Sequence, residues 1–228
     1  MVRKLVSIIS PTFNEEDNVD ELYKKIVAAI DPLSDKYAFE ILIIDNNSSD
    51  NTVEKLRAIA KSDQRLKVIV NMRNFGHIRS PLHAFMQSSG DATIYLASDL
   101  QDPPEMIPEF ISYWEKGFKL VMAIKPKSEG NKVINLLRRA YYKLLESSTD
   151  VPIVKDATGF GLYDREILRH IAEINDPYPY FRGLVSELGY PIKTIVFDQP
   201  KRIKGVSKNN FYTLYDIAWL GFVGHSKV

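Results

Sequence analysis

The chain has 228 residues, of which 45% are hydrophobic and 26% are charged, and its formal net charge is +1. That length is enough to bury one sizeable core, and the near-balance of 30 basic and 29 acidic side chains gives no indication of a nucleic-acid partner. Cysteine is absent, which excludes a disulfide framework and a thiolate metal site. The first apolar run is too short for a signal peptide, and no run of about 18 apolar residues predicts a transmembrane helix.

Strand-like and helix-like patterns alternate through the first half of the chain. Short apolar runs predict strands at 5–10, 40–45, 66–71, 92–97 and 119–125. Helical patterns follow the first four strands. The first covers 14–30, with acids in its first turns, and the fourth starts near Pro103 and Pro104, where proline suits a first turn. Continuous apolar strands separated by helices indicate a mostly parallel sheet with helices on both faces.

The second half is less regular. Its patterns predict a helix over 131–148, a strand at 159–163, a helix over 165–174, a further segment at 181–188 and a strand at 192–198. No repeat or linker divides the chain, so we predict one α/β domain over residues 1–210. The apolar segment 211–228 is either a helix packed on the core or an amphipathic helix lying on a membrane.

Polar residues follow four of the predicted strands, in "PTFNEE", "DNNSSD", "NMRNFG" and "SDLQD". Ligands of open α/β sheets bind beyond the carboxyl ends of the strands, and carboxylates stand there after three strands, at Glu15, Asp45 and Asp99. Each of them alone has a structural alternative. Asp45, for example, could simply open the turn that Ser48 and Ser49 complete.

The residue types at these strand ends suit a nucleotide. A carboxylate can accept hydrogen bonds from a base or a ribose, and Phe13 can lie against a base. Asp99 and Gln101 lie two residues apart, so in extended geometry both side chains would face one side. Their oxygen atoms are ligands that Mg²⁺ or Mn²⁺ prefers beside a diphosphate. The glycine fingerprints of dinucleotide sites and P-loops are absent.

Six segments in a fixed order carry a family resemblance: "VSIISPTFNEEDNV", "EILIIDNNSSDNT", "RNFG", "GDATIYLASDLQDPPE", "FRGLVSELGY" and "RIKGVSK". Together they resemble glycosyltransferase family 2, whose nucleotide-sugar-binding GT-A fold is a Rossmann-like α/β fold. "DLQDPPE" and the later "RIKGVSK" are similar to the branch that contains dolichyl-phosphate mannose synthase and bacterial polyprenyl-phosphate glycosyltransferases. The resemblance covers nearly the whole chain.

The resemblance implies a role for each matching residue. The nucleotide site would comprise Pro11, Phe13, Glu15, Asp45, Asn74, Ser98 and Asp99. Asp99 and Gln101 would hold Mg²⁺ or Mn²⁺ on the diphosphate, and Asp99 and Asp156 would be the catalytic residues. The acceptor phosphate would meet Arg138, Arg202, Ser207 and Lys208. Arg138 could instead lie on a solvated helix face, and Asp156 could be a turn or cap residue.

Three positions depart from the family pattern. The metal motif commonly has two aspartates in D-x-D, whereas this chain has "ASD", with Ala97 at the first position. The family often has an arginine where Gly161 stands, which removes one expected contact to an acceptor phosphate. Arg79 stands where a small residue is expected, and it is either a replacement cation or a solvated arginine at a helix start.

The resemblance implies an inverting glycosyltransferase. It would move a sugar from a UDP- or GDP-sugar to an undecaprenyl or dolichyl phosphate, with metal assistance. It would act on the cytoplasmic side of a membrane, either as a peripheral protein or as the catalytic domain of a membrane protein. The sequence leaves open whether the chain forms a homo-oligomer. One alternative is a soluble family 2 enzyme that extends a cell-surface polysaccharide. Another is an inactive nucleotide-binding module, because the D-x-D lacks one carboxylate.

Overall fold

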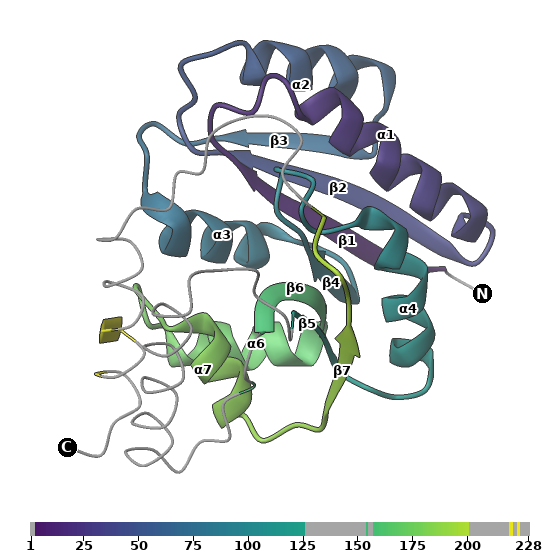
Figure 1. Ribbon diagram of the computed structural model, residues 1–228, viewed down its shortest axis with the longest axis vertical. Coiled ribbons are helices and arrows are strands. Elements are labelled where there is room, and N and C mark those ends of the chain that lie inside the picture. The colour runs from purple at the N-terminus through teal and green to yellow at the C-terminus, as the bar shows by residue number, and fades with distance from the viewer. Residues whose placement is uncertain (1–2, 126–153, 155–156, 201–218, 221–222, 224–228) are drawn as a thin grey trace.

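The computed structural model describes residues 3–125, 154, 157–200, 219–220 and 223. Within these residues seven strands form one sheet, in the order β3-β2-β1-β4-β6-β5-β7 (Figure 1). The strands are β1 Lys4–Thr12, β2 Tyr37–Asp45, β3 Leu66–Val70, β4 Ala92–Tyr95, β5 Leu120–Ile124, β6 Ala157–Asp164 and β7 Ile192–Val196. Four neighbouring pairs are parallel, and β6 runs antiparallel to both β4 and β5. The prediction of a mostly parallel sheet is confirmed.

Helices cover both faces of the sheet (Figure 1). They are α1 Val19–Ile30, α2 Thr52–Ser62, α3 Gly76–Gln87, α4 Ile107–Glu115, α6 Arg165–Ile174 and α7 Phe181–Glu187, with short 3-10 turns η1 Asp31–Leu33 and η2 Pro104–Met106. The buried side chains of α1, α2 and α4 pack in one core layer, and those of α3, α6 and α7 pack in the other. The fold is thus the predicted α/β class.

The alternation of side chains along the central strand supplies both core layers. Ile8 lies in the layer under α1 and α4, and Ile9 lies in the layer under α3 and α6, because successive side chains of a strand point to opposite faces. Both are fully buried. A strand that is buried on both faces reads as a continuous apolar run, which is why these strands are visible in the sequence.

Several element boundaries differ from the sequence prediction, and those at the candidate site are the ends of β1 and β4 and the start of α1. β1 continues through Pro11 to Thr12. Proline is tolerated there because β4 ends opposite Ile9, so no partner strand faces the nitrogen of Pro11. β4 stops at Tyr95, two residues early. α1 starts at Val19, and Asn14, where the predicted helix begins, has a φ of 53°, which is incompatible with a helix.

Two predicted segments fall on parts of the chain that the structure does not describe. The helix predicted over 131–148 lies outside the described residues, as does most of the segment 211–228. Of that segment, Trp219 and Leu220 are helical and Trp219 and Val223 are exposed. Among the described residues, no helix has both the length and the apolar character needed to cross a membrane.

Candidate active site at the carboxyl edge of the sheet

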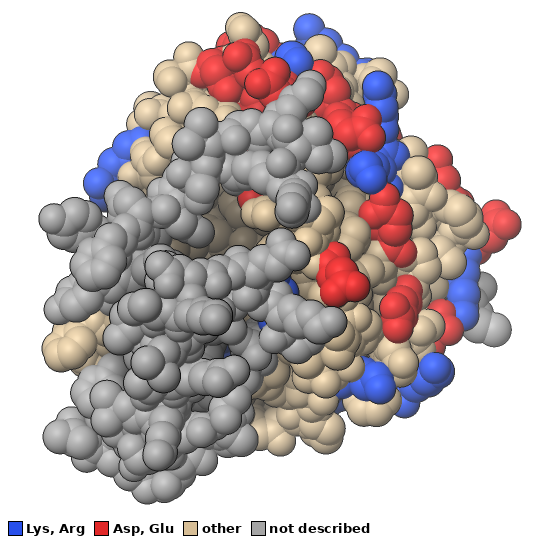
Figure 2. Space-filling model, viewed as in Figure 1, with Lys and Arg blue, Asp and Glu red and all other residues tan. Residues whose placement is uncertain are grey.

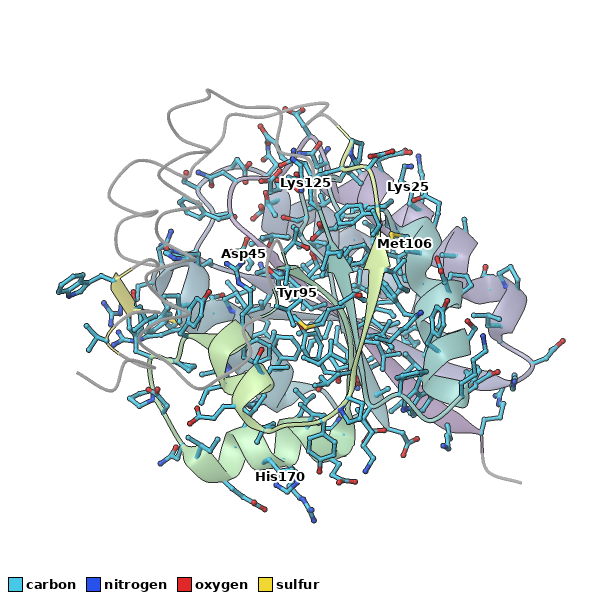
Figure 3. The ribbon with its side chains drawn as sticks, turned by 60° about the horizontal axis from the view of Figure 1, so that its bottom comes forward. Lys25, Asp45, Tyr95, Met106, Lys125 and His170 are labelled. Atoms are coloured by element: carbon cyan, nitrogen blue, oxygen red, sulfur yellow. The ribbon has the colours of Figure 1, made fainter. Side chains whose placement is uncertain are left out.

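The polar loops after β1, β2 and β4 meet at one edge of the sheet. β1 and β2 are parallel and in register up to Thr12 and Asp45, and β4 runs parallel to β1 with Tyr95 opposite Ile9. The carboxyl ends of all three strands therefore point the same way. Figure 3 marks two of these positions, Asp45 and Tyr95. The structure brings the predicted residues of these loops to this edge.

Asp45 is fully buried, and its carboxylate holds the turn that follows β2. Its Oδ2 atom accepts a hydrogen bond from the Ser48 amide at 2.8 Å, and Oδ1 accepts bonds from the hydroxyls of Ser48 and Thr12. This is the structural role that the sequence left open for Asp45. Contact of Asp45 with a base stays a prediction, and the turn fixes where its carboxylate lies.

The loop after β1 is tied to the loop after β2. The amide of Asn14 donates to the Ser48 hydroxyl, and the Asn14 side chain accepts from the Ser49 amide, both at 2.8 Å. Glu15 is buried, and its carboxylate accepts from Asn18 at 2.6 Å, so it contacts the start of α1. Pro11 and Phe13 are half-buried. The two bonds of Asn14 tie together the two loops of the predicted nucleotide site.

An asparagine without an assigned role, Asn46, fixes the loop that precedes α3. Its side chain donates to the Asn74 side chain at 2.8 Å and accepts from the Phe75 amide at 2.8 Å. Asn74 in turn accepts from the amide of Gly76, the first residue of α3. Asn74 is therefore held beside the β2 loop, as a shared site requires. Only the "NN" after β2 signals Asn46 in the sequence, and this pair reads equally well as turn residues.

The segment after β4 is a turn, so the predicted extended geometry of Asp99 and Gln101 is wrong. Leu100, between them, has a φ of 61°, and the Asp99 carboxylate accepts from the Gln101 amide at 3.1 Å. Leu100 is 7% exposed, so its burial in the core accompanies this uncommon backbone conformation. Asp99 and Gln101 are both half-buried, and Ser98 is buried.

Asp102 is a second carboxylate of this turn that the sequence analysis did not assign. It is 3% exposed, and its Oδ2 atom accepts from the Ala97 amide at 2.9 Å. Burial and the nearby charge of Asp99 raise the pKa of Asp102 to about 7, although the hydrogen bond from the Ala97 amide lowers it. Asp102 thus closes the turn that presents Asp99.

A cavity of about 320 Å³, lined by both apolar and polar side chains, lies beside this turn, between α3 and the start of α7. Tyr95, at the end of β4, and Arg182, in the first turn of α7, both line it. Arg182 donates to the carbonyl of Ala157 at 2.5 Å. Sequence analysis assigned neither residue, because Tyr95 and Arg182 lie far apart in the chain and only the fold brings them to one cavity.

The Gly161 departure has a physical cause. A Cβ atom at this position would lie 2.2 Å from the backbone oxygen of Val121 in the neighbouring strand. The pairing of β5 with β6 shifts register between Met122 and Ile124. The strand backbones therefore occupy the space that a side chain would need, and an arginine does not fit here without backbone movement.

Arg79 lies on the exposed side of the first turn of α3. Its guanidinium is 5.0 Å from the ring centroid of Tyr178, which is a cation–π distance. Exposure at a helix start agrees with the second of the two alternatives that the sequence left open.

Several predicted site residues lie outside the described residues: Arg138, Asp156, Arg202, Ser207 and Lys208. The described neighbours of two of these segments lie near the site. β6 begins at Ala157, and its antiparallel pairing with β4 brings that end to the carboxyl edge. Gln101 is 3.4 Å from the carbonyl of Pro200. Within the described part of the chain, no group of three histidine, aspartate or glutamate side chains is placed to hold a metal ion.

Comparison with known proteins gives a family for the chain. Residues 7–172 match glycosyl transferase family 2. An uncharacterized glycosyltransferase of Bacillus subtilis, YkcC, is 32% identical over 89% of this chain and 62% of its own length. A protein of Shigella phage SfV named bactoprenol glucosyl transferase is 29% identical over 97% of this chain and 72% of its own. The chain thus spans between 62 and 72% of these two relatives.

Solved structures share the fold. The mannosyltransferase PcManGT from Pyrobaculum calidifontis, in complex with GDP-Man and Mn²⁺, superposes with a TM-score of 0.62 at 18% identity, over 98% of this chain and 64% of that chain. The glucosyl-3-phosphoglycerate synthase of Mycobacterium tuberculosis gives a TM-score of 0.55 at 18% identity, over 95% of this chain and 76% of that chain. At such identities the likeness shows the GT-A fold alone. The match over residues 7–172 is the deciding observation: the chain belongs to glycosyl transferase family 2.

Proposed function

We propose that the chain transfers a sugar from a nucleotide-diphosphate sugar to a polyprenyl phosphate, with the help of a divalent metal ion. Family membership supports the transfer of a sugar. The relative named bactoprenol glucosyl transferase aligns over 97% of the chain and supports a polyprenyl phosphate acceptor. The observation that carries the proposal is the meeting of the β1, β2 and β4 loops at one edge of the sheet.

The donor nucleotide would bind between the loops after β1 and β2. Phe13 and Pro11 would contact the base, and Asp45, Glu15, Asn74 and Ser98 would line the base and ribose site. The bonds that Ser48 and Asn46 make hold these loops in place before any ligand arrives. Such preorganisation lowers the ordering cost of binding.

The residues after β4 offer oxygen ligands of the kind that a divalent cation binds. Asp99 supplies a carboxylate and Gln101 an amide oxygen, both on half-buried side chains. Mg²⁺ commonly takes only one or two carboxylates and completes its shell with phosphate oxygens and water, so a single aspartate in "ASD" suffices in number. When bound, the metal neutralises charge on the leaving diphosphate. The proposed metal is Mg²⁺ or Mn²⁺.

An oxygen of the lipid phosphate would attack the anomeric carbon of the sugar. The bond from that carbon to the diphosphate oxygen breaks, the nucleoside diphosphate leaves, and the configuration inverts. A phosphate is already ionised near neutral pH, so Asp156 would orient the acceptor rather than remove a proton. Arg138, Arg202, Ser207 and Lys208 would bind its charge, since cations and hydroxyls suit phosphate oxygens. The reaction would take place at a membrane surface, where the acceptor resides.

The test is to supply UDP- and GDP-sugars with either a short polyprenyl phosphate or an oligosaccharide, and to identify the products by mass spectrometry. We expect one sugar to appear on the lipid phosphate and the matching nucleoside diphosphate to be released. Sugar found only on the oligosaccharide would instead support the polysaccharide-extending alternative. Donor binding without transfer to either acceptor would support an inactive module.

A further inference from the structure

The cavity beside the β4 turn is lined mainly by apolar side chains, and His77, Thr158 and Arg182 add polar groups to its wall. α3 contributes Ile78, Leu82 and Phe85 to it, and the start of α7 contributes Phe181. The Phe85 ring stacks on the Phe181 ring with centroids 4.6 Å apart. Most ligand pockets measure about 300–1,000 Å³, so a cavity of about 320 Å³ is at the small end of that range. It fits one end of a long ligand.

We propose that this cavity binds the first isoprene units of the acceptor, and that Arg182 on its wall binds the acceptor phosphate. The inference rests on the proposed function, because it names where the acceptor of that reaction lies. It adds a site and a residue that the sequence motifs did not assign.

The lining favours an isoprenoid over the transferred sugar. A sugar presents several hydroxyl groups, and burying each without a hydrogen-bond partner costs free energy. The walls around Phe85 offer mainly aromatic and aliphatic surface. A branched hydrocarbon loses no hydrogen bonds there and gains from leaving water. An isoprenoid is therefore the better occupant.

Arg182 lies where a phosphate at the end of that hydrocarbon would need a cation. The guanidinium carries five N–H donors, and its bond to the Ala157 carbonyl takes one. Tyr95, the last residue of β4, lines the same cavity as Arg182. The turn that carries Asp99 follows β4 directly, so acceptor and donor phosphates would meet near this strand end.

Apolar side chains also continue from the cavity toward the C-terminal segment. Leu220 lines the cavity, and its neighbour Trp219 is 57% exposed and Val223 61% exposed. On the face shown in Figure 2, acidic side chains lie at the top, over α1 and α2, and continue down the right-hand side past α4. Carboxylates there would repel an anionic head group.

The test measures binding by calorimetry and does not depend on turnover. The probes are prenyl phosphates with one, two and three isoprene units, together with inorganic phosphate. Leu82→Trp fills the cavity, whereas His83→Trp adds the same bulk on the exposed side of α3. For wild type we expect affinity to increase with each isoprene unit until the cavity is full. Leu82→Trp should raise the Kd of the three-unit phosphate about tenfold or more, and His83→Trp should leave it unchanged.

A second pair of variants tests the cation without altering the cavity volume much. Arg182→Gln should weaken binding of all three prenyl phosphates about tenfold. Arg169→Gln, on the exposed surface of α6, should not. Both variants should bind the donor nucleotide as wild type does, which also shows that they are folded.

The inference is overturned if wild type binds no prenyl phosphate, or if Leu82→Trp and Arg182→Gln bind them as wild type does. It is also overturned if Leu82→Trp weakens a nucleotide sugar but not the free nucleotide, because the cavity would then hold the sugar. Failure of the proposed function looks different. In that case no sugar reaches any lipid phosphate, although prenyl phosphates still bind and Leu82→Trp still weakens them.

Discussion

Replacing Asp99 with alanine is expected to lower kcat/KM for sugar transfer by about 100-fold or more. Asp99 supplies the only carboxylate of the "ASD" triplet, because the first position is Ala97. Its removal would leave the metal with the amide of Gln101 and with ligand phosphates. Initial rates at saturating Mn²⁺, with and without the substitution, measure the effect.

The matched control is Glu105→Gln, which removes a carboxylate from the same segment of chain. The Glu105 side chain is 58% exposed and pairs with Lys25 at 2.7 Å, so it takes no part in the site. We expect this variant to keep the wild-type rate. An Asp99→Ala protein as active as wild type would mean that the metal, if one is needed, binds elsewhere.

Asp102→Asn is expected to stabilise the fold above neutral pH. The pKa of Asp102 is about 7 in the folded chain, against about 3.9 in an unfolded one. Between these values the folded state binds more protons, so the free energy of unfolding falls as pH rises from about 4 to 7. Asparagine does not titrate and keeps an acceptor for the Ala97 amide. The free energy of unfolding of wild type should therefore fall by on the order of 2–4 kcal/mol from pH 4 to pH 8 relative to that of the variant.

Urea denaturation in the presence of a chelator, at several pH values, measures this difference. Asp35→Asn, at an exposed position, is the control and should follow the wild-type profile. Parallel pH profiles for wild type and Asp102→Asn would show that Asp102 is ionised in the fold. The turn that presents Asp99 would then rest on a buried charge.

Much of the fold is legible in the sequence because its strands are buried on both faces. The run "EILIID" is continuously apolar between Glu40 and Asp45, and it lies in the strand β2. The direction of β6 could not be predicted, since an apolar run of a few residues carries no information about its neighbours. Only its pairing with β4 and β5 shows that it is antiparallel.

The candidate site was predictable as a place but not in its geometry. Parallel strands put Asp45 and Asp99 at one edge, and that follows from the order of motifs. The conformation of Leu100 does not, because a leucine with a φ of 61° is uncommon and depends on tertiary packing. The inward position of Asp102 follows from that turn. The cavity between α3 and α7 depends on contacts such as that of Phe85 with Phe181, which no local pattern reveals.

The central claim is that this edge of the sheet binds a nucleotide with a metal, and calorimetric titration of UDP and GDP into the wild-type chain tests it most directly. Each titration is run with Mn²⁺ and again with a chelator. The account predicts that one of the two nucleotides binds, that Mn²⁺ strengthens its binding, and that the chelator removes this gain. If neither nucleotide bound under either condition, the loops after β1, β2 and β4 would not form a donor site, and the proposed function would be contradicted.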